Sequence, residues 1–175
     1  MFVMTTRTNW VDRKFGFGLD NGLFPNIIER LRGTPARIKA LVEALPEDLL
    51  TQRDGEKWSI KEHIGHLGDL EELHEGRIDD FIAVQDRLRP ADMENRKTYE
   101  ADHNEKGLVE LIGDFNKART IFVGRLESLE EPILESVAMH PRLDEEMRIV
   151  DMAHFTAEHD DHHLASITML IRKYG

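Results

Sequence analysis

Cysteine is absent from this chain of 175 residues. Its absence excludes disulfide bonds, thiolate metal ligands, iron–sulfur clusters and a cysteine nucleophile. Long apolar runs are absent as well: the longest have four residues, at 1–4 and 81–84, whereas a membrane-spanning helix needs about 20. The start of the chain shows no basic flank followed by an apolar stretch. We therefore expect no secretory signal, no membrane partner and a cytoplasmic protein.

Basic residues are fewer than acidic ones. The chain has 23 Lys and Arg against 34 Asp and Glu, which gives a formal net charge of −11. The basic residues form no cluster, and such clusters supply most of the affinity of proteins for nucleic acid because they neutralise phosphates. We therefore expect no nucleic-acid partner. Without thiols, any metal ion must be held by imidazole and oxygen ligands, and thiol chemistry would need a thiol brought in by a co-substrate.

Helical periodicity dominates the remaining sequence. Apolar residues recur at helical spacing in four segments, and no stretch alternates as a strand would; we place these helices at 26–45, 59–87, 105–129 and 148–173. The first is interrupted at Gly33, after which Thr34 has the position of an N-cap and Pro35 that of the first helical residue. Ser59 and Glu62 form the pattern of a capping box, which marks the start of the second helix.

The segments between these helices are long. Polar connections cover 89–105 and 130–146, the second with a short turn expected at 133–137. Helices joined by such connections are typical of a bundle with crossover loops. The sequence therefore predicts an all-α fold, a single four-helix bundle with long crossover connections over 24–175, and an irregular N-terminal segment, 1–23, packed on the core.

Nine histidines are present, and most lie on the second and fourth helices. His159 and His163 follow the apolar stripe of the fourth helix, and side chains four residues apart lie about 6 Å from each other between their Cβ atoms. Such a pair can converge on one metal ion at about 2.0–2.1 Å. The second helix offers His63, His66 and His74, and spacing alone does not choose among them. Histidines that serve only as core or surface residues are the alternative.

Two motifs in these helices resemble the metal-binding motifs of the DinB-like superfamily of four-helix bundles. The first is WSIKEHIGHLGDLE at 58–71, and the second is AEHDDHHLASI at 157–167. The resemblance covers about 24–173 and implies a bacterial protein that forms a homodimer. It also implies one divalent ion, zinc or nickel, held by His66, His159 and His163.

Three neutral imidazoles leave a metal ion its full charge. Such an ion lowers the pKa of a bound water from about 15.7 to about 7, or it holds a thiol as thiolate. The resemblance implies two matching activities on a small-molecule substrate. We expect first a transferase or isomerase that uses a low-molecular-weight thiol as co-substrate. The alternatives are a metal-dependent hydrolase and a non-catalytic, stress-related binding protein with a structural metal.

Groups that could support this chemistry lie near the histidines. Three carboxylates are candidates for a base or for a hydrogen-bond acceptor of an imidazole: Glu62, Asp69 and Asp160. Four further residues are candidates for substrate binding: His63, His162, His140 and Arg142. Simpler alternatives stand beside these roles: Glu62 is already explained by the capping box, the other carboxylates suit a solvated helix face, and Arg142 suits a surface arginine near a helix start.

Overall fold

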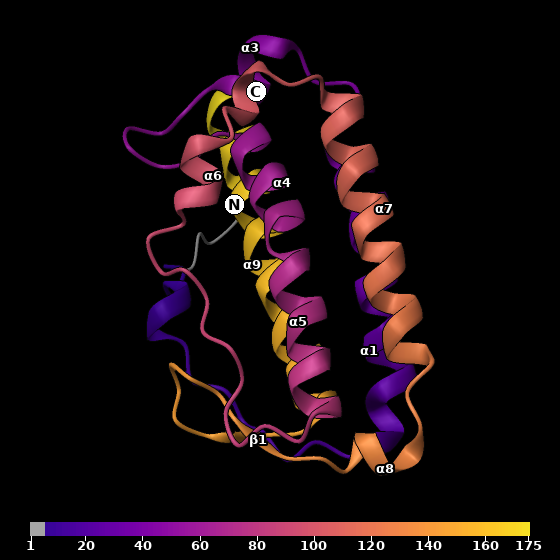
Figure 1. Cartoon of the computed structure of the whole chain (residues 1–175). Coiled ribbons are helices and arrows are strands. Elements are labelled where there is room, and N and C mark those ends of the chain that lie inside the picture. The colour runs from indigo at the N-terminus through magenta and orange to yellow at the C-terminus, as the bar shows by residue number, and fades with distance from the viewer. Residues whose placement is uncertain (1–5) are drawn as a thin grey trace.

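Four helical columns build the structure, which is a computed structural model describing residues 6–175 (Figure 1). Two columns are pairs of consecutive helices: α1 (Phe24–Arg32) with α2 (Thr34–Val42), and α4 (Ile60–Asp69) with α5 (Glu71–Ile82). The other two columns are single helices, α7 (Leu108–Glu127) and α9 (Ile149–Tyr174). The predicted all-α four-helix bundle is confirmed. Within the described part of the chain, no helix has the length and apolar character needed to cross a membrane.

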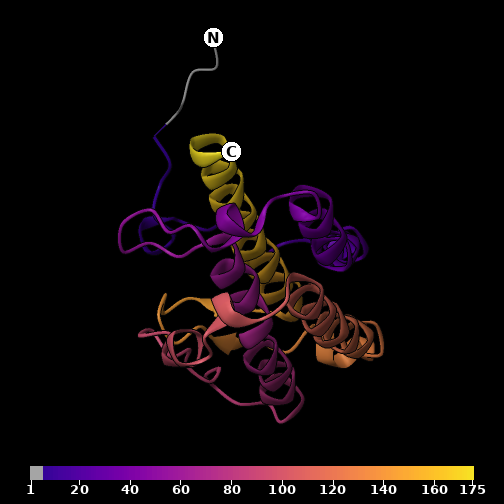
Figure 2. The same ribbon diagram turned by 90° about the horizontal axis from the view of Figure 1, so that it is seen from above.

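The columns form a square when the bundle is seen along its axis (Figure 2). Both α7 and α9 pack against α1 and also against α4. The first two columns of the chain are therefore diagonal to each other, and long connections are needed to join columns that are not hairpin neighbours. This arrangement places α4 directly beside α9, the two helices that carry the candidate metal ligands.

The break in the first column falls at Gly33, as predicted, but the expected role of Thr34 as N-cap is wrong. Gly33 occupies the cap position, and its carbonyl accepts from the amide of Arg37 at 3.0 Å. The Thr34 hydroxyl instead donates to Oδ2 of Asp160 on α9 at 2.7 Å. A tertiary hydrogen bond has thus replaced the local one that the sequence pattern favoured.

The second column differs from the single helix expected over 59–87. The capping box of Ser59 and Glu62 starts α4 as predicted, but the helix is interrupted at Leu70 and α5 ends at Ile82. Leu70 keeps right-handed helical dihedral angles, so the chain continues in nearly the same direction and the helix is only locally loosened. Gly65 and Gly68, just before this point, lower the helix propensity of α4. The column ends before Pro90 because the chain turns back there, with Val84 at a φ of +52°.

The connections carry more structure than the sequence indicated. They contain four short helices, α3 (Glu47–Thr51), α6 (Arg96–Glu100), η3 (His103–Glu105) and α8 (Glu131–Leu134). The last begins before the turn predicted at 133–137 and overlaps it only in part. The expectation of no strand is wrong: β1 (Ala138–Met139) pairs antiparallel with β2 (Glu146–Met147). Strands of two residues are too short to show an alternating pattern, and β1 is also held from outside, because its Met139 amide donates to the Asp86 carbonyl at 2.8 Å.

The N-terminal segment runs along one side of the bundle (Figure 1). It contains two short 3₁₀ turns, η1 (Trp10–Asp12) and η2 (Asn21–Leu23), and is otherwise irregular. Trp10, Phe15 and Phe17 are partly buried against the core. Residues 1–5 lie outside the described part, and the division of the chain at residue 23 stays a prediction.

A buried polar layer crosses the middle of the bundle and separates two apolar clusters. On α7, for example, Phe115 belongs to one cluster and Phe122 to the other, and the intervening Arg119 is 1% exposed. The other columns contribute their own buried polar residues at this level: Thr34, Glu71, His74, Asp160 and His163. The candidate metal ligands lie at the edge of this layer.

Candidate metal centre

The structure brings together the three histidines that the resemblance selected. His66 extends from α4, and His159 and His163 lie one turn apart on α9. Each ring offers one nitrogen to a group in which all ligand atoms lie within 4.8 Å of one another. His66 and His163 are 4% and 5% exposed, and His159 is partly buried. Residues distant in sequence therefore form one compact group that could hold a metal ion.

The nitrogen spacing fits a single ion. Nε2 of His159 and Nε2 of His163 are 3.1 Å apart. Two ligands of a tetrahedral ion, each at 2.0–2.1 Å, are separated by about 3.3–3.4 Å. The two rings of α9 are therefore already close to the distance at which one cation would bind both.

A hydrogen-bond chain fixes the orientation of His66. The hydroxyl of Thr98 on α6 donates to Oδ2 of Asp69 at 2.9 Å. Because that hydroxyl has only one proton, it must accept at its 3.0 Å contact with Nδ1 of His66. His66 therefore carries its proton on Nδ1 and leaves the lone pair of Nε2 for a ligand. Metal-binding histidines are usually oriented in this way.

His63 supports His163 in a similar manner. The Nδ1 atoms of these two rings are 2.8 Å apart, so one ring donates to the other. If Nε2 of His163 binds a cation, its Nδ1 carries the proton and His63 accepts it. Trp58 packs over the same group, with its ring centroid 4.5 Å from that of His66 and 6.0 Å from that of His163. The structure thus places His63 within hydrogen-bond distance of the candidate ligand His163, where it can hold that ring in place.

The N-terminal segment covers the third ring of the group. Trp10 contacts His159 edge to face at 4.9 Å between centroids. His162, expected as a substrate-binding candidate, accepts from the guanidinium of Arg7 at 2.8 Å and also borders the cavity. The segment before α1 therefore closes part of the wall around the candidate ligands.

Burial keeps the three imidazoles neutral at physiological pH. It lowers the pKa of His66 to about 2 and that of His159 to about 3, and it lowers the pKa of His163 well below its ordinary value. Neighbouring histidines lower these pKa values further. Neutral imidazole is the form that binds metal ions, so the donors are ready for a cation without first losing a proton.

Of the three candidate carboxylates, Asp69 alone is linked by hydrogen bonds to a candidate ligand, His66, through Thr98. Burial would raise the pKa of Glu62, but hydrogen bonds from Arg53 and from the Ser59 amide hold it below its ordinary value. Glu62 therefore completes the capping box and an ion pair with Arg53. Asp160, although next to His159 in sequence, bonds to Arg119 and Thr34 in the polar layer.

Two residues of this site could not be expected from the sequence. Thr98 orients His66, and Nε2 of His103 lies 2.8 Å from Oδ2 of Asp69. Both lie in the connection that looked merely polar and aperiodic. Gly65 is a weak signal for this contact, because a Cβ there would lie 2.3 Å from the His103 ring, so the close approach of η3 to α4 requires glycine.

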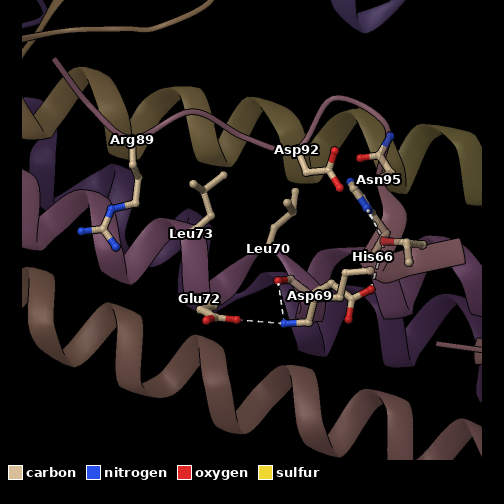
Figure 3. Close-up of a pocket in the computed structure, with 10 residues that line it drawn as sticks. His66, Asp69, Leu70, Glu72, Leu73, Arg89, Asp92 and Asn95 are labelled. Carbon is tan, nitrogen blue, oxygen red and sulfur yellow. Dashed lines mark hydrogen bonds and ion pairs between the residues drawn. The ribbon is translucent and has the colours of Figure 1, made fainter. Parts of the chain in front are cut away.

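A cavity of about 540 Å³ opens beside the three candidate ligands, and all three line it. His140 and Arg142, expected to overhang the open end of the site, also line this cavity. A smaller cavity of about 250 Å³ adjoins it at His66. Figure 3 shows the segment with Asp92 and Asn95 running alongside α4 and α5, with Leu70 and Leu73 pointing toward it. The imidazoles therefore face space that a small molecule can enter.

This geometry defines a class of protein: a four-helix bundle whose neighbouring helices bring three imidazoles together beside an open cavity. A family model described as the DinB superfamily matches residues 30–167, so the chain belongs to the DinB superfamily.

A solved structure with a similar fold is that of YfiT from Bacillus subtilis. The TM-score is 0.76 at 21% identity, and the match covers 92% of this chain and 93% of that chain. That protein is described as "a probable metal-dependent hydrolase with an unusual four-helix bundle topology". At this level of identity the likeness establishes the fold. No curated protein matches the chain significantly.

Proposed function

We propose that the protein is a metal-dependent hydrolase of a small molecule, with one divalent ion, zinc or nickel, held by His66, His159 and His163. The observation that carries the proposal is the convergence of three imidazole nitrogens within 4.8 Å at the wall of a cavity. The description of YfiT as a metal-dependent hydrolase supports the same class of reaction.

The residues of the chain would prepare the site for such an ion. When bound, a divalent ion supplies Lewis acidity and lowers the pKa of a coordinated water to about 7. The three imidazoles contribute no charge, so they leave the positive charge of the ion uncompensated. Thr98 and His63 hold two of the rings in position through hydrogen bonds of 3.0 and 2.8 Å. Three protein ligands leave further coordination positions open, which is typical of catalytic sites.

The cavity indicates the size of the substrate. Its volume of about 540 Å³ falls within the range of about 300–1,000 Å³ common for small-molecule sites. Leu70, Leu73 and Phe155 give it apolar walls, which suit a substrate with an apolar part. A macromolecular substrate would have to present a single extended group to reach the histidines.

Turnover of model substrates tests the proposal. Metal-free full-length protein is reloaded with zinc or nickel and given ester, amide and phosphoester panels without any thiol. We expect hydrolysis that depends on the ion and is lost in His163→Ala. The same panels, with electrophiles added, are then repeated with low-molecular-weight thiols.

Two other outcomes of these assays would contradict the proposal of a hydrolase. Turnover only with a thiol would establish the transferase that the sequence first indicated. If both panels stay silent while a chelator lowers the melting temperature, the ion is structural, since a ligand that binds only the native state stabilises it.

A further inference from the structure

The cavity has a second set of polar residues that the proposed metal centre does not use. Arg77 of α5 lines it, and so do His140 and Arg142 of the loop between β1 and β2. His140 belongs to a stretch of chain that turns back beneath the helices (Figure 1). One cavity therefore joins the three candidate ligands to a cluster with two guanidinium groups, in a protein of net charge −11.

The two arginines have no carboxylate partner. Arg77 is 4% exposed, and its hydrogen bond goes from Nε to the carbonyl of Arg89 at 3.2 Å. The neighbouring Asp80 is occupied by the side chain and amide of Arg89. Nη2 of Arg142 is enclosed and lacks a hydrogen-bond partner. Among residues 6–175, no Asp or Glu forms an ion pair with either arginine.

His140 adds a hydrogen-bond donor to this cluster. Its Nδ1 accepts from the amide of Leu143 at 3.1 Å, so the proton of the neutral ring must be on Nε2. Burial keeps this ring neutral. His140 is only 3% exposed, and its Nε2 is enclosed without a hydrogen-bond partner among the described residues. The imidazole therefore presents an unused N–H group beside the two cations.

Such an arrangement is costly unless something completes it. A buried charge or donor without a partner loses its interactions with water and gains nothing in exchange. Of the described residues that line the cavity, only Asp92 has a carboxylate. That carboxylate already accepts from the amides of Glu94 and Arg96. The planar fork of a guanidinium matches the oxygens of a carboxylate or phosphate.

We propose that Arg77, Arg142 and the Nε2–H group of His140 bind an oxyanion, the carboxylate or phosphate group of the substrate. The bond that reacts would then lie at the other wall of the cavity, beside the three candidate ligands. The identification of the bound molecule as a substrate rests on the proposed function. Binding of the oxyanion itself does not need the metal centre.

Calorimetric titration of metal-free full-length protein with inorganic phosphate, and separately with acetate, tests this proposal. We expect one saturable site and at least a tenfold loss of affinity in Arg77→Met and in Arg142→Met, since each removes a charged partner. Tighter binding of phosphate would assign a phosphate group, and tighter binding of acetate would assign a carboxylate. Arg32→Met is the matched control, because Arg32 is exposed and paired with Glu29 and Glu127.

Two results would overturn the oxyanion site. One is that neither anion binds the wild-type chain. The other is that both bind Arg142→Met, a variant in an outer loop, as tightly as they bind wild type. If Arg77→Met fails to fold by circular dichroism, Arg142→Met and His140→Phe still decide the question. A silent hydrolase assay with intact phosphate or acetate binding would reject the proposed reaction and retain this site.

Discussion

Arg119 and Arg77 are both buried cations in the same bundle, but their surroundings differ. Arg119 lies in the polar layer, where Nη2 donates to Glu71 at 2.6 Å and to Asp160 at 3.1 Å. Burial alone would lower its pKa, but these two carboxylates raise it above its ordinary value. Arg77 forms no ion pair with any described carboxylate, and burial lowers its pKa to about 10, although the charge of Asp80 acts in the opposite direction.

The difference separates a structural group from one prepared for a ligand. The Arg119 guanidinium is paired with two carboxylates of the protein, and these ion pairs link α7 to α5 and α9. At the cavity, donors of Arg77, Arg142 and His140 remain without partners. A buried arginine therefore serves the packing of helices at Arg119 and the binding of a ligand at Arg77.

Removal of Arg119 should have the largest effect on stability. Arg119→Met leaves Glu71 and Asp160 buried together without a cation, which costs about 3–5 kcal/mol when a buried pair is broken. Urea denaturation measures the change in the free energy of unfolding. Arg32→Met, on the surface, should lose less than about 1 kcal/mol. If Arg119→Met and Arg32→Met lowered the free energy of unfolding by similar small amounts, Arg119 would not have the structural role inferred from its ion pairs.

Removal of the hydroxyl that orients His66 should have the next largest effect, a loss of metal affinity. Thr98→Val removes the hydroxyl that accepts from Nδ1 of His66, and loss of such a partner costs about 10–100-fold in metal affinity. Competition with a chromogenic chelator measures that affinity. Thr98→Ser keeps the hydroxyl and should bind the ion nearly as wild type does. Equal affinities for the serine and valine variants would contradict the orienting role.

The polar layer should also make stability depend on pH. Burial raises the pKa of Glu71 from 4.5 to about 7, more than Arg119 lowers it. The native state then holds a proton that the unfolded state has lost, so this group's stabilisation is full below pH 4.5 and fades as pH rises to about 7. Urea denaturation across this range should show a smaller decline for Glu71→Gln. An unchanged pH profile would mean that Glu71 is ionised in the folded protein.

The smallest change is expected for the unpaired cation. Arg77→Met removes a buried charge that forms no ion pair with a described carboxylate, so the free energy of unfolding should change by less than about 1 kcal/mol or increase. Thermal unfolding with and without phosphate gives a second reading, because phosphate should stabilise wild type and not the variant. A loss as large as that of Arg119→Met would show that Arg77 is structural.

The bundle could be predicted because its determinants are local. Apolar residues at helical spacing indicated the four columns, and the capping box of Ser59 and Glu62 marked the first residue of α4. The interruption at Leu70 and the early end of α5 could not be predicted, because apolar residues recur at helical spacing through both. The strands of two residues are too short to leave a pattern, and a contact with the distant Asp86 holds β1. Thr34 illustrates the same limit, since its hydroxyl bonds to Asp160 on another column.

The candidate site was predictable in part. Helical spacing placed His159 and His163 on one inward face, but in the second column it left His63, His66 and His74 open, and only the resemblance selected His66. Residues that support the rings from a connection have no periodic pattern, so Thr98 and His103 could not be found. The unpaired donors at the cavity depend on which partners are missing, which only a structure reveals.

Calorimetric titration of metal-free protein with zinc tests most directly whether three imidazoles from α4 and α9 hold one ion. We expect saturation at one ion per chain, with binding strongly weakened in His66→Ala, His159→Ala and His163→Ala, each folded by circular dichroism. Zinc that binds all three variants as tightly as it binds wild type, or that does not bind wild type at all, would contradict it.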